Sequence, residues 1–315
     1  MRLISVDDVR AAAARIGGTA LRTPLLRQDW ADRPVWLKPE NLQPVGAFKV
    51  RGAVNALAAL DDDVRARGVV SYSSGNHAQA VAFAAKRLGV PATIVVQAGA
   101  PQVKVEATMA FGAEVVEAPM AERQAVARRL AERLGQVVIP PFDHPEVIAG
   151  QGTVGLEITE DLPEVTAVLV PISGGGLAAG VGVAVTALCP NARVIGVEPE
   201  LAADTAESLR AGRLVRWRPE DRARTIADGL RTEPSELTFA HLRAVLDGVV
   251  TVSEDEIRQA MRALATLAHL VAEPSGAVST AAWLFHGEEL PPGPTVAVVS
   301  GGNVDPRLLA EVLAG

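Results

Sequence analysis

The sequence predicts an α/β protein of two lobes, each built on an open, mostly parallel, twisted sheet flanked by helices. The chain of 315 residues exceeds the size at which one hydrophobic core usually suffices. Short apolar runs alternate with segments of helical length, which is typical of crossover units on a parallel sheet. The Pro-rich stretch IPPFDHPEV at 139–147 interrupts this alternation and indicates the crossing from one lobe to the other.

The first half of the chain predicts the N-terminal elements of the large domain and, after them, the smaller lobe. A helix is expected over 5–16, because Ser5 can cap its start and Gly17 and Gly18 can end it. A short strand at 35–38 leads into a helix of small residues at 47–60. Further strands are expected at 69–72, 93–96, 113–117 and 137–139, and further helices at 78–88, 101–111 and 120–134.

The second half repeats the alternation on a larger scale. Ser253 and Glu256 form a capping box that starts a helix at 257–269, whereas the stretch before 249 looks less regular. Strands are expected at 167–170, 194–197, 249–252 and 295–299. One helix is expected at 146–160, a second from the glycine loop to Leu188, and a short one at the C-terminus. We therefore expect a large domain from residues 1–48 and 143–315 and a small domain from residues 49–142.

Composition limits the partners. A net charge of -7, a pI near 5.4 and 3% aromatic residues argue against a nucleic acid or an acidic membrane surface as partner. The apolar run at 165–190 is broken by Pro171 and three glycines, so it predicts a strand, a loop and a buried helix rather than a membrane span. A single cysteine, Cys189, and an N-terminus without a signal peptide indicate a cytoplasmic protein.

The stretch NLQPVGAFKVRG at 41–52 places Lys49 just after a Pro44/Gly46 turn, at the start of a predicted helix. Positive partial charge at a helix start and apolar neighbours make an amine lose its proton more easily, which suits a nucleophile for Schiff-base chemistry. The alternative is a solvated lysine on an amphipathic helix.

Two loops at the carboxyl ends of predicted strands are suited to anions. SSGNH at 73–77 opens a helix, where backbone N–H groups attract a carboxylate or phosphate; ordinary capping is the alternative. SGGGL at 173–177 can bring successive N–H groups close to a phosphate. It also fits a dinucleotide pattern through Gly174, Gly176 and Ala179, with Glu198 on a ribose, or a glycine turn without a ligand.

Three further positions carry polar groups at strand or helix ends. Glu198 and Asp204, with the carbonyl of Ala202, could bind a hard divalent cation, or they could be solvated acids. Ser300, in SGGN at 300–303, could hydrogen-bond a heterocyclic nitrogen or cap a helix. Glu273, in EPSG, lies at the mouth of another helix, where an acid could also simply complement the helix dipole.

Taken together, these motifs resemble the fold-type II pyridoxal phosphate enzymes, specifically the threonine/serine dehydratase and serine racemase family. The resemblance runs nearly end to end, through TPL at Thr23, QPVGAFKVRGA at Gln43, SSGNHAQA at Ser73, AGQGT at Ala149, SGGGL at Ser173, EPSG at Glu273 and SGGNVD at Ser300. It implies that the large domain binds pyridoxal 5'-phosphate and that the active site lies between the lobes.

The resemblance also implies a role for each candidate residue. Lys49 would form the Schiff base. The other cofactor contacts would come from Phe48 beside the ring, Asn76 at the ring hydroxyl, Ser300 at the pyridine nitrogen, Glu273, and the phosphate loop of Ser173, Gly174, Gly175, Gly176 and Leu177. The substrate carboxylate would be bound by Ser73, Ser74, Asn76 and His77, and Mg²⁺ or Ca²⁺ by Glu198, Ala202 and Asp204.

The activity implied is an ammonia-lyase that converts L-threonine or L-serine to 2-oxobutyrate or pyruvate and ammonia. Ser74 stands where dehydratases of the family typically have alanine and racemases have serine, so serine racemase, alone or as a second activity, is an alternative. 3-Hydroxyaspartate is an alternative substrate, and a nicotinamide-dependent oxidoreductase is the alternative from another class. A homodimer or higher homo-oligomer is expected.

Overall fold

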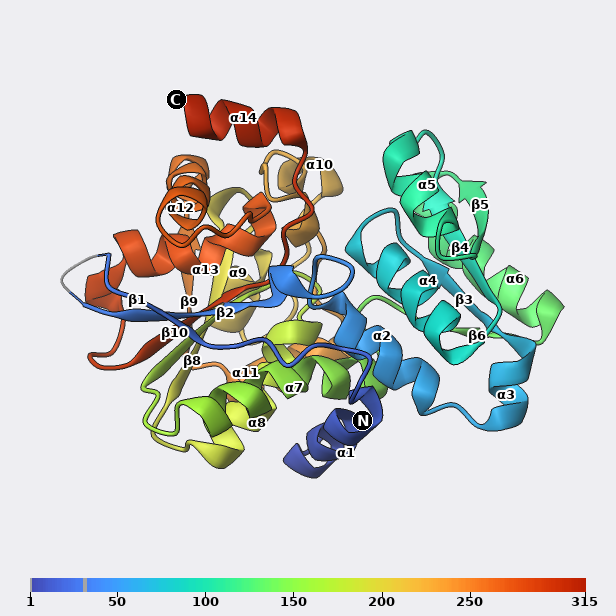
Figure 1. Ribbon diagram of the computed structural model, residues 1–315, viewed down its shortest axis with the longest axis horizontal. Coiled ribbons are helices and arrows are strands. Elements are labelled where there is room, and N and C mark those ends of the chain that lie inside the picture. The colour runs from blue at the N-terminus through green and yellow to red at the C-terminus, as the bar shows by residue number, and fades with distance from the viewer. Residues whose placement is uncertain (1, 31–32) are drawn as a thin grey trace.

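The computed structural model describes residues 2–30 and 33–315, which fold into two lobes (Figure 1). One lobe contains a six-stranded sheet of order β1-β2-β10-β7-β8-β9, and the other a four-stranded sheet of order β5-β4-β3-β6. Within these two sheets every neighbouring pair is parallel except β1 and β2. The predicted fold class is therefore confirmed.

The larger sheet is buried on both faces. Its central strands are continuous apolar runs, so each contributes alternate side chains to two separate cores. Val168 and Val296 belong to the core on one face, and Leu169 and Ala297 to the core on the other. The strands are β1 (Leu26–Gln28), β2 (Val35–Pro39), β7 (Ala167–Pro171), β8 (Arg193–Pro199), β9 (Gly248–Val252) and β10 (Thr295–Val299).

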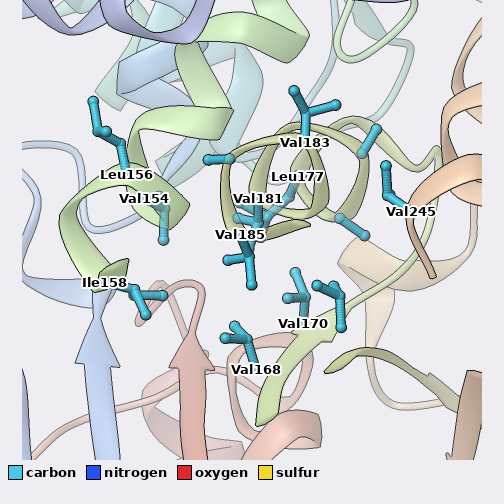
Figure 2. Packing of buried hydrophobic residues seen from close by; sticks show 14 of the residues in the cluster. Val154, Leu156, Ile158, Val168, Val170, Leu177, Val181, Val183, Val185 and Val245 are labelled. Atoms are coloured by element: carbon cyan, nitrogen blue, oxygen red, sulfur yellow. The ribbon is translucent and has the colours of Figure 1, made fainter. Parts of the chain in front are cut away.

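Helices cover both faces of this sheet. Figure 2 shows the first core, where valines of α7, α8 and β7 meet. The helices around that core are α1 (Val6–Ile16), α7 (Pro145–Asp161), α8 (Gly176–Leu188) and α11 (Glu236–Val245). The opposite core includes α12 (Glu254–Thr266) and α13 (Pro274–Phe285), and α14 (Pro306–Ala314) packs on α12. The short helices α9 (Asp204–Ala211) and α10 (Pro219–Arg222) complete this lobe.

The smaller lobe has its own core between α2, α4 and its sheet. Its strands are β3 (Val69–Tyr72), β4 (Ala92–Gln97), β5 (Glu114–Ala118) and β6 (Val137–Val138). Its helices are α2 (Lys49–Ala58), α3 (Asp62–Arg67), α4 (Asn76–Leu88), α5 (Gln102–Met109) and α6 (Arg123–Leu134). Because α2 packs on both α4 and α7, it lies between the two lobes (Figure 1). The remaining short elements are the 3₁₀ turns η1 (Glu40–Leu42), η2 (Met120–Glu122), η3 (Glu200–Ala202), η4 (Asp228–Leu230) and η5 (Gly287–Glu289).

Most helix starts predicted from capping residues are confirmed. Ser5 caps α1, and Ser253 and Glu256 form the capping box of α12. The stretch before 249 is more regular than predicted, because it contains α9, α10 and α11. α12 ends at Thr266, three residues earlier than predicted, and His269 beyond it has a left-handed backbone with φ 58°. In the described part of the chain no helix is long and apolar enough to cross a membrane.

Candidate active site

The predicted loops meet at the carboxyl ends of their strands, between the two lobes. The Lys49 segment is bonded directly to the SGGN loop that follows β10: Phe48 N–H donates to the carbonyl of Ser300 at 3.0 Å. Ala47 and Gly301 also form an antiparallel bridge, and Gly302 N–H donates to the carbonyl of Gly46 at 2.8 Å. Segments about 250 residues apart in sequence are therefore fixed to one another beside Lys49.

Lys49 is the first residue of α2, as predicted. Its Nζ donates to the carbonyl of Pro141 at 2.9 Å and lies 4.9 Å from the centre of the Phe48 ring. Burial lowers the pKa of Lys49 to about 8, because its surroundings disfavour the charged amine. A carbonyl and a ring face do not neutralise the ammonium charge, so part of the population carries a neutral amine near neutral pH. This is the state that a nucleophile requires.

The SSGNH loop joins β3 to the N-terminus of α4. Ser73 Oγ accepts from Gly75 N–H at 3.2 Å, and α4 begins at Asn76, so the first N–H groups of this helix lack intrahelical acceptors. His77 points inward instead. It is 2% exposed, its Nε2 lies 3.2 Å from the carbonyl of Ile139, and burial and Lys49 lower its pKa to about 3. Only the backbone N–H of His77 remains suitable for a substrate carboxylate.

Asn76 connects the two lobes. Its Nδ2 donates to Glu273 Oε1 at 2.7 Å, and its Oδ1 accepts from Asn303 at 2.9 Å. Burial, with a smaller contribution from Asp228, raises the pKa of Glu273 to about 8, so this carboxyl group is largely protonated at neutral pH. Ser300 is 4% exposed, and its Oγ donates to the carbonyl of Ser275 at 3.3 Å. Asn76 and Glu273 are thus bonded to one another, and Ser300 is bonded to Ser275, two residues beyond Glu273 in the chain.

The SGGGL loop follows β7 and leads into α8, which begins at Gly176. Gly175 has a φ of 85°, a conformation that favours glycine. A Cβ on Gly174 would lie 2.3 Å from the ring of Phe142, so this glycine is also required by packing. Ser173 is held by Thr232, whose N–H donates to Ser173 Oγ at 3.0 Å and whose carbonyl accepts from it at 2.9 Å. Leu177 is 4% exposed within the core. The first-turn N–H groups of α8 therefore form a pre-shaped site for a phosphate.

Glu198 and Asp204 are buried rather than solvated, being 1% and 2% exposed. Glu198 accepts from the N–H groups of Thr205 at 3.1 Å and Ala206 at 2.8 Å, while Asp204 Oδ2 has no hydrogen-bond partner in the described structure. Burial and Asp204 raise the pKa of Glu198 to about 8, and burial raises that of Asp204 to about 6. Ala202 is fully buried beside them. No group of three His, Cys, Asp or Glu side chains suited to a metal occurs in residues 2–30 and 33–315.

Two contacts at the site were not predicted. Ser74 Oγ accepts from Gln97 N–H at 2.8 Å and lies 3.5 Å from Nη1 of Arg123 at the start of α6. Burial lowers the pKa of Arg123. No carboxylate among the described residues lies within 4 Å of its guanidinium. The second is the hydrogen bond that Lys49 Nζ donates to the carbonyl of Pro141. Only the order of the strands brings Arg123 to Ser74, so no local sequence signal could have found it.

Fold and site together define a two-lobed protein in which a partly buried lysine is bonded to the carbonyl of Pro141, next to the Phe142 ring that packs on the SGGGL loop. The chain belongs to the pyridoxal-phosphate dependent enzyme family, whose model matches residues 14–301. The family resemblance inferred from the sequence is therefore confirmed. The donor set fits this cofactor, since a lysine amine, a phosphate-sized set of helix N–H groups and a buried hydroxyl occur together.

Known proteins similar to this chain cover almost its whole length. L-threo-3-hydroxyaspartate ammonia-lyase of Saccharomyces cerevisiae is 41% identical over 98% of this chain and 96% of its own length. Serine racemase of Schizosaccharomyces pombe is 40% identical over 99% of this chain and 98% of its own. The solved structure of maize serine racemase superposes with a TM-score of 0.92 at 38% identity, covering 99% of this chain and 98% of the other. A crystal structure of a threonine deaminase superposes with a TM-score of 0.90 at 45% identity, covering 96% of this chain and 99% of the other.

These results leave the nicotinamide alternative without support. Glu198 is 1% exposed, so its carboxyl group is not accessible at the surface to a ribose hydroxyl. The chain is a pyridoxal phosphate-dependent enzyme, and its homologues include ammonia-lyases, a threonine deaminase and serine racemases.

Proposed function

We propose that this protein is a pyridoxal phosphate-dependent ammonia-lyase that converts L-threonine or L-serine to 2-oxobutyrate or pyruvate and ammonia. The observation that supports this most is the set of contacts around Lys49, whose pKa is lowered. Its amine is bonded to the carbonyl of Pro141, next to the Phe142 ring that packs on the SGGGL loop, and the adjacent Phe48 N–H is bonded to the carbonyl of Ser300. In this proposal residues 1–48 and 143–315 hold the cofactor, and residues 49–142 contribute the SSGNH loop for the substrate.

The chain's own residues account for each requirement of the reaction. Pyridoxal phosphate, once bound, supplies the electron sink that makes the substrate α-C–H acidic. Lys49 is the base for that proton, because a pKa of about 8 leaves a useful neutral fraction near neutral pH. The N–H groups at the start of α4 bind the substrate carboxylate. Ser300 can hydrogen-bond a ring nitrogen without a formal negative charge that would keep this nitrogen protonated.

Reconstitution and product analysis test the proposal. Purified protein with pyridoxal phosphate is expected to show imine absorbance and to release 2-oxo acid from L-threonine and L-serine. Lys49→Ala should lose the imine band and at least about 10³-fold in kcat, in the range that positioned acid–base groups contribute. A Lys49→Ala variant that kept both the band and the turnover would disprove the proposal.

Racemisation is the second candidate, and Ser74 supports it. Racemisation requires a second group that protonates the α-carbon from the face opposite Lys49. A serine hydroxyl can donate this proton if its oxygen can then carry the negative charge. The guanidinium of Arg123, 3.5 Å from Ser74 Oγ, favours that charge. Chiral analysis of L-serine incubations tests this: D-serine should form in the unmodified protein and disappear in Ser74→Ala, while 2-oxo acid release continues.

Arg123 also favours a substrate with a second carboxylate, as in 3-hydroxyaspartate. Arg123 is partly buried and has no acidic partner among the described residues, so it is ready to pair with an anion, and such charge-assisted bonds are strong. We expect Arg123→Met to raise KM for L-threo-3-hydroxyaspartate about 10-fold or more, with L-threonine much less affected. An equal rise in KM for both substrates would mean that Arg123 acts only through Ser74 and does not bind the second carboxylate.

A divalent cation, Mg²⁺ or Ca²⁺, is proposed beside Glu198 and Asp204. The unpaired Asp204 Oδ2 and the raised pKa values of both carboxyl groups are what a missing positive charge would produce. Because no third acidic or imidazole ligand is present among the described residues, the carbonyl of Ala202 and water would complete the set.

A further inference from the structure

The segment AGQGT at 149–153, in the middle of α7, is a family motif to which the proposed chemistry assigns no task. It lies where α7 packs against three other helices, α1, α2 and α8. α2 begins with Lys49, and α8 begins at the SGGGL loop. α7 therefore contacts both of the elements that would hold the two ends of the cofactor.

Arg51 ties α2 to α7 from the side opposite Lys49, since residues two apart on a helix project in nearly opposite directions. Its guanidinium is fully buried and bonds both oxygens of Glu40, at 2.7 and 2.8 Å, and both of Glu157, at 2.6 and 2.8 Å. Further bonds of 3.1 Å go to Thr153 Oγ1 and to the carbonyl of Leu21. A planar group that is bonded in so many directions fixes the rotation of its helix as well as its position.

The contact between α2 and α7 also involves their backbones directly. A Cβ on Gly150 would lie 2.7 Å from the carbonyl oxygen of Arg51 and 2.7 Å from Cα of Gly52. Gln151 spans the same contact through its Oε1, which accepts from Gly52 N–H at 3.3 Å. Since backbone cannot rotate aside as a side chain can, any larger residue at 150 must displace α2.

The other side of α7 meets α8 equally closely. A Cβ on Gly152 would lie 2.8 Å from the carbonyl oxygen of Gly180, and one on Gly155 would lie 2.7 Å from that of Val181. Gly180 is about one helical turn from the start of α8 at Gly176. Figure 2 shows the valines of α7 and α8 that close this packing toward β7.

We infer that Arg51 and the glycines of α7 are positioning residues that fix the distance and angle between Lys49 and the phosphate loop. This inference rests on the proposed function, because the two ends matter together only for a ligand that carries both an aldehyde and a phosphate. Such a ligand gains affinity from the second contact only when the two sites are correctly spaced, whereas a ligand for one site is insensitive to the spacing.

The experiment compares three probes in the Gly150→Ala variant: pyridoxal phosphate, pyridoxal, which has only the aldehyde, and inorganic phosphate. Each is titrated into apoprotein, with imine absorbance or competition as the readout. We expect the affinity for pyridoxal phosphate to fall about 10-fold or more, while the affinities for pyridoxal and inorganic phosphate stay within about twofold. Arg51→Lys, which keeps the charge but has fewer donors, should give the same pattern and serves if Gly150→Ala does not fold.

Gly182→Ala is the matched control. It adds the same methyl group to α8, but on the side that faces α11. There the added Cβ would lie 2.2 Å from Cγ2 of the Val245 side chain. We expect unchanged affinity for pyridoxal phosphate. Unchanged affinity in Gly150→Ala and Arg51→Lys, or an equal fall for all three probes, would overturn the inference. If the unmodified protein bound no pyridoxal phosphate, the proposed function itself would fail, which is a different result.

Discussion

The molecule contains two kinds of buried charge, and they differ in whether an opposite charge lies beside them. In the Arg51 cluster, which we define as Lys38, Glu40, Arg51 and Glu157, two cations and two anions are bonded to one another. Lys38 completes it with bonds of 2.6 Å to Glu157 and to the carbonyl of Thr23. A second set, Lys49, Glu198, Asp204 and Glu273, forms no ion pair within 4 Å among the described residues.

This difference separates structural charge from functional charge. Within the Arg51 cluster the opposite charges raise the pKa of Arg51 and lower that of Glu40, despite burial, so both residues stay ionised. In the second set, burial dominates and moves the pKa of Lys49 and Glu273 to about 8. A buried group without a partner is unfavourable unless a ligand or a proton transfer uses it, so its retention points to function.

The largest effect should come from breaking the balanced cluster. Arg51→Met leaves two buried carboxylates beside one lysine, so we expect a loss of about 3–5 kcal/mol in the free energy of unfolding. Denaturant unfolding of the apoprotein measures this directly. Arg10→Ala is the control, because Arg10 pairs with Asp7 on the surface, where both side chains are more than half exposed, and such pairs contribute about 1 kcal/mol or less. Similar losses in both variants would mean that the cluster is not structural.

The sequence does contain a signal for this cluster. Lys38, Arg51 and Glu157 each stand inside an apolar run, as in WLKP, KVRGAV and GLEI, which is unusual unless the charge is paired. What the sequence could not show is that these three separate runs meet, because that depends on α2 crossing α7 beside β2. Each charge alone was compatible with an exposed position.

The fold was predictable where one physical signal was strong. The parallel strands β7 and β10 are short runs composed mostly of apolar residues, and α12 has a complete capping box. β1 was missed because its three residues form a strand only by antiparallel pairing with β2, and no local sequence pattern predicts that pairing. α11 was missed because Ser235 and Thr238 cap it with a hydroxyl pair rather than the usual serine and glutamate.

The site divides in the same way. Loops after apolar strands, such as SGGGL and SGGN, were found because glycine and hydroxyl residues at strand ends are a local signal. Arg123 and the carbonyl of Pro141 were not, since each acts on a residue that is distant in sequence.

A cation should stabilise the unpaired acids. If Mg²⁺ or Ca²⁺ binds Glu198 and Asp204, a concentration of 100 times the Kd should raise the free energy of unfolding by about 2.7 kcal/mol. A chelator should reverse the gain, and the double variant Glu198→Gln with Asp204→Asn should abolish it. Thermal unfolding with and without each metal measures this. Stabilisation that persists in the double variant would place the cation elsewhere.

The smallest expected effect, but the most direct contrast, concerns the two lysines Lys38 and Lys49. Lys38 is fully buried in the Arg51 cluster, whereas Lys49 is partly buried and bonded only to a carbonyl within the described structure. Brief acetylation of apoprotein across pH, read by mass spectrometry, should label Lys49 with a midpoint near 8 and leave Lys38 unmodified. Below that pH the Lys49 amine is protonated and unreactive; above it the amine is neutral. The reference is free Nα-acetyl-lysine in the same sample, with its midpoint near about 10.4. Added pyridoxal phosphate should protect Lys49, and a Lys49 midpoint equal to the reference would mean that this amine is solvated, with no advantage as a nucleophile.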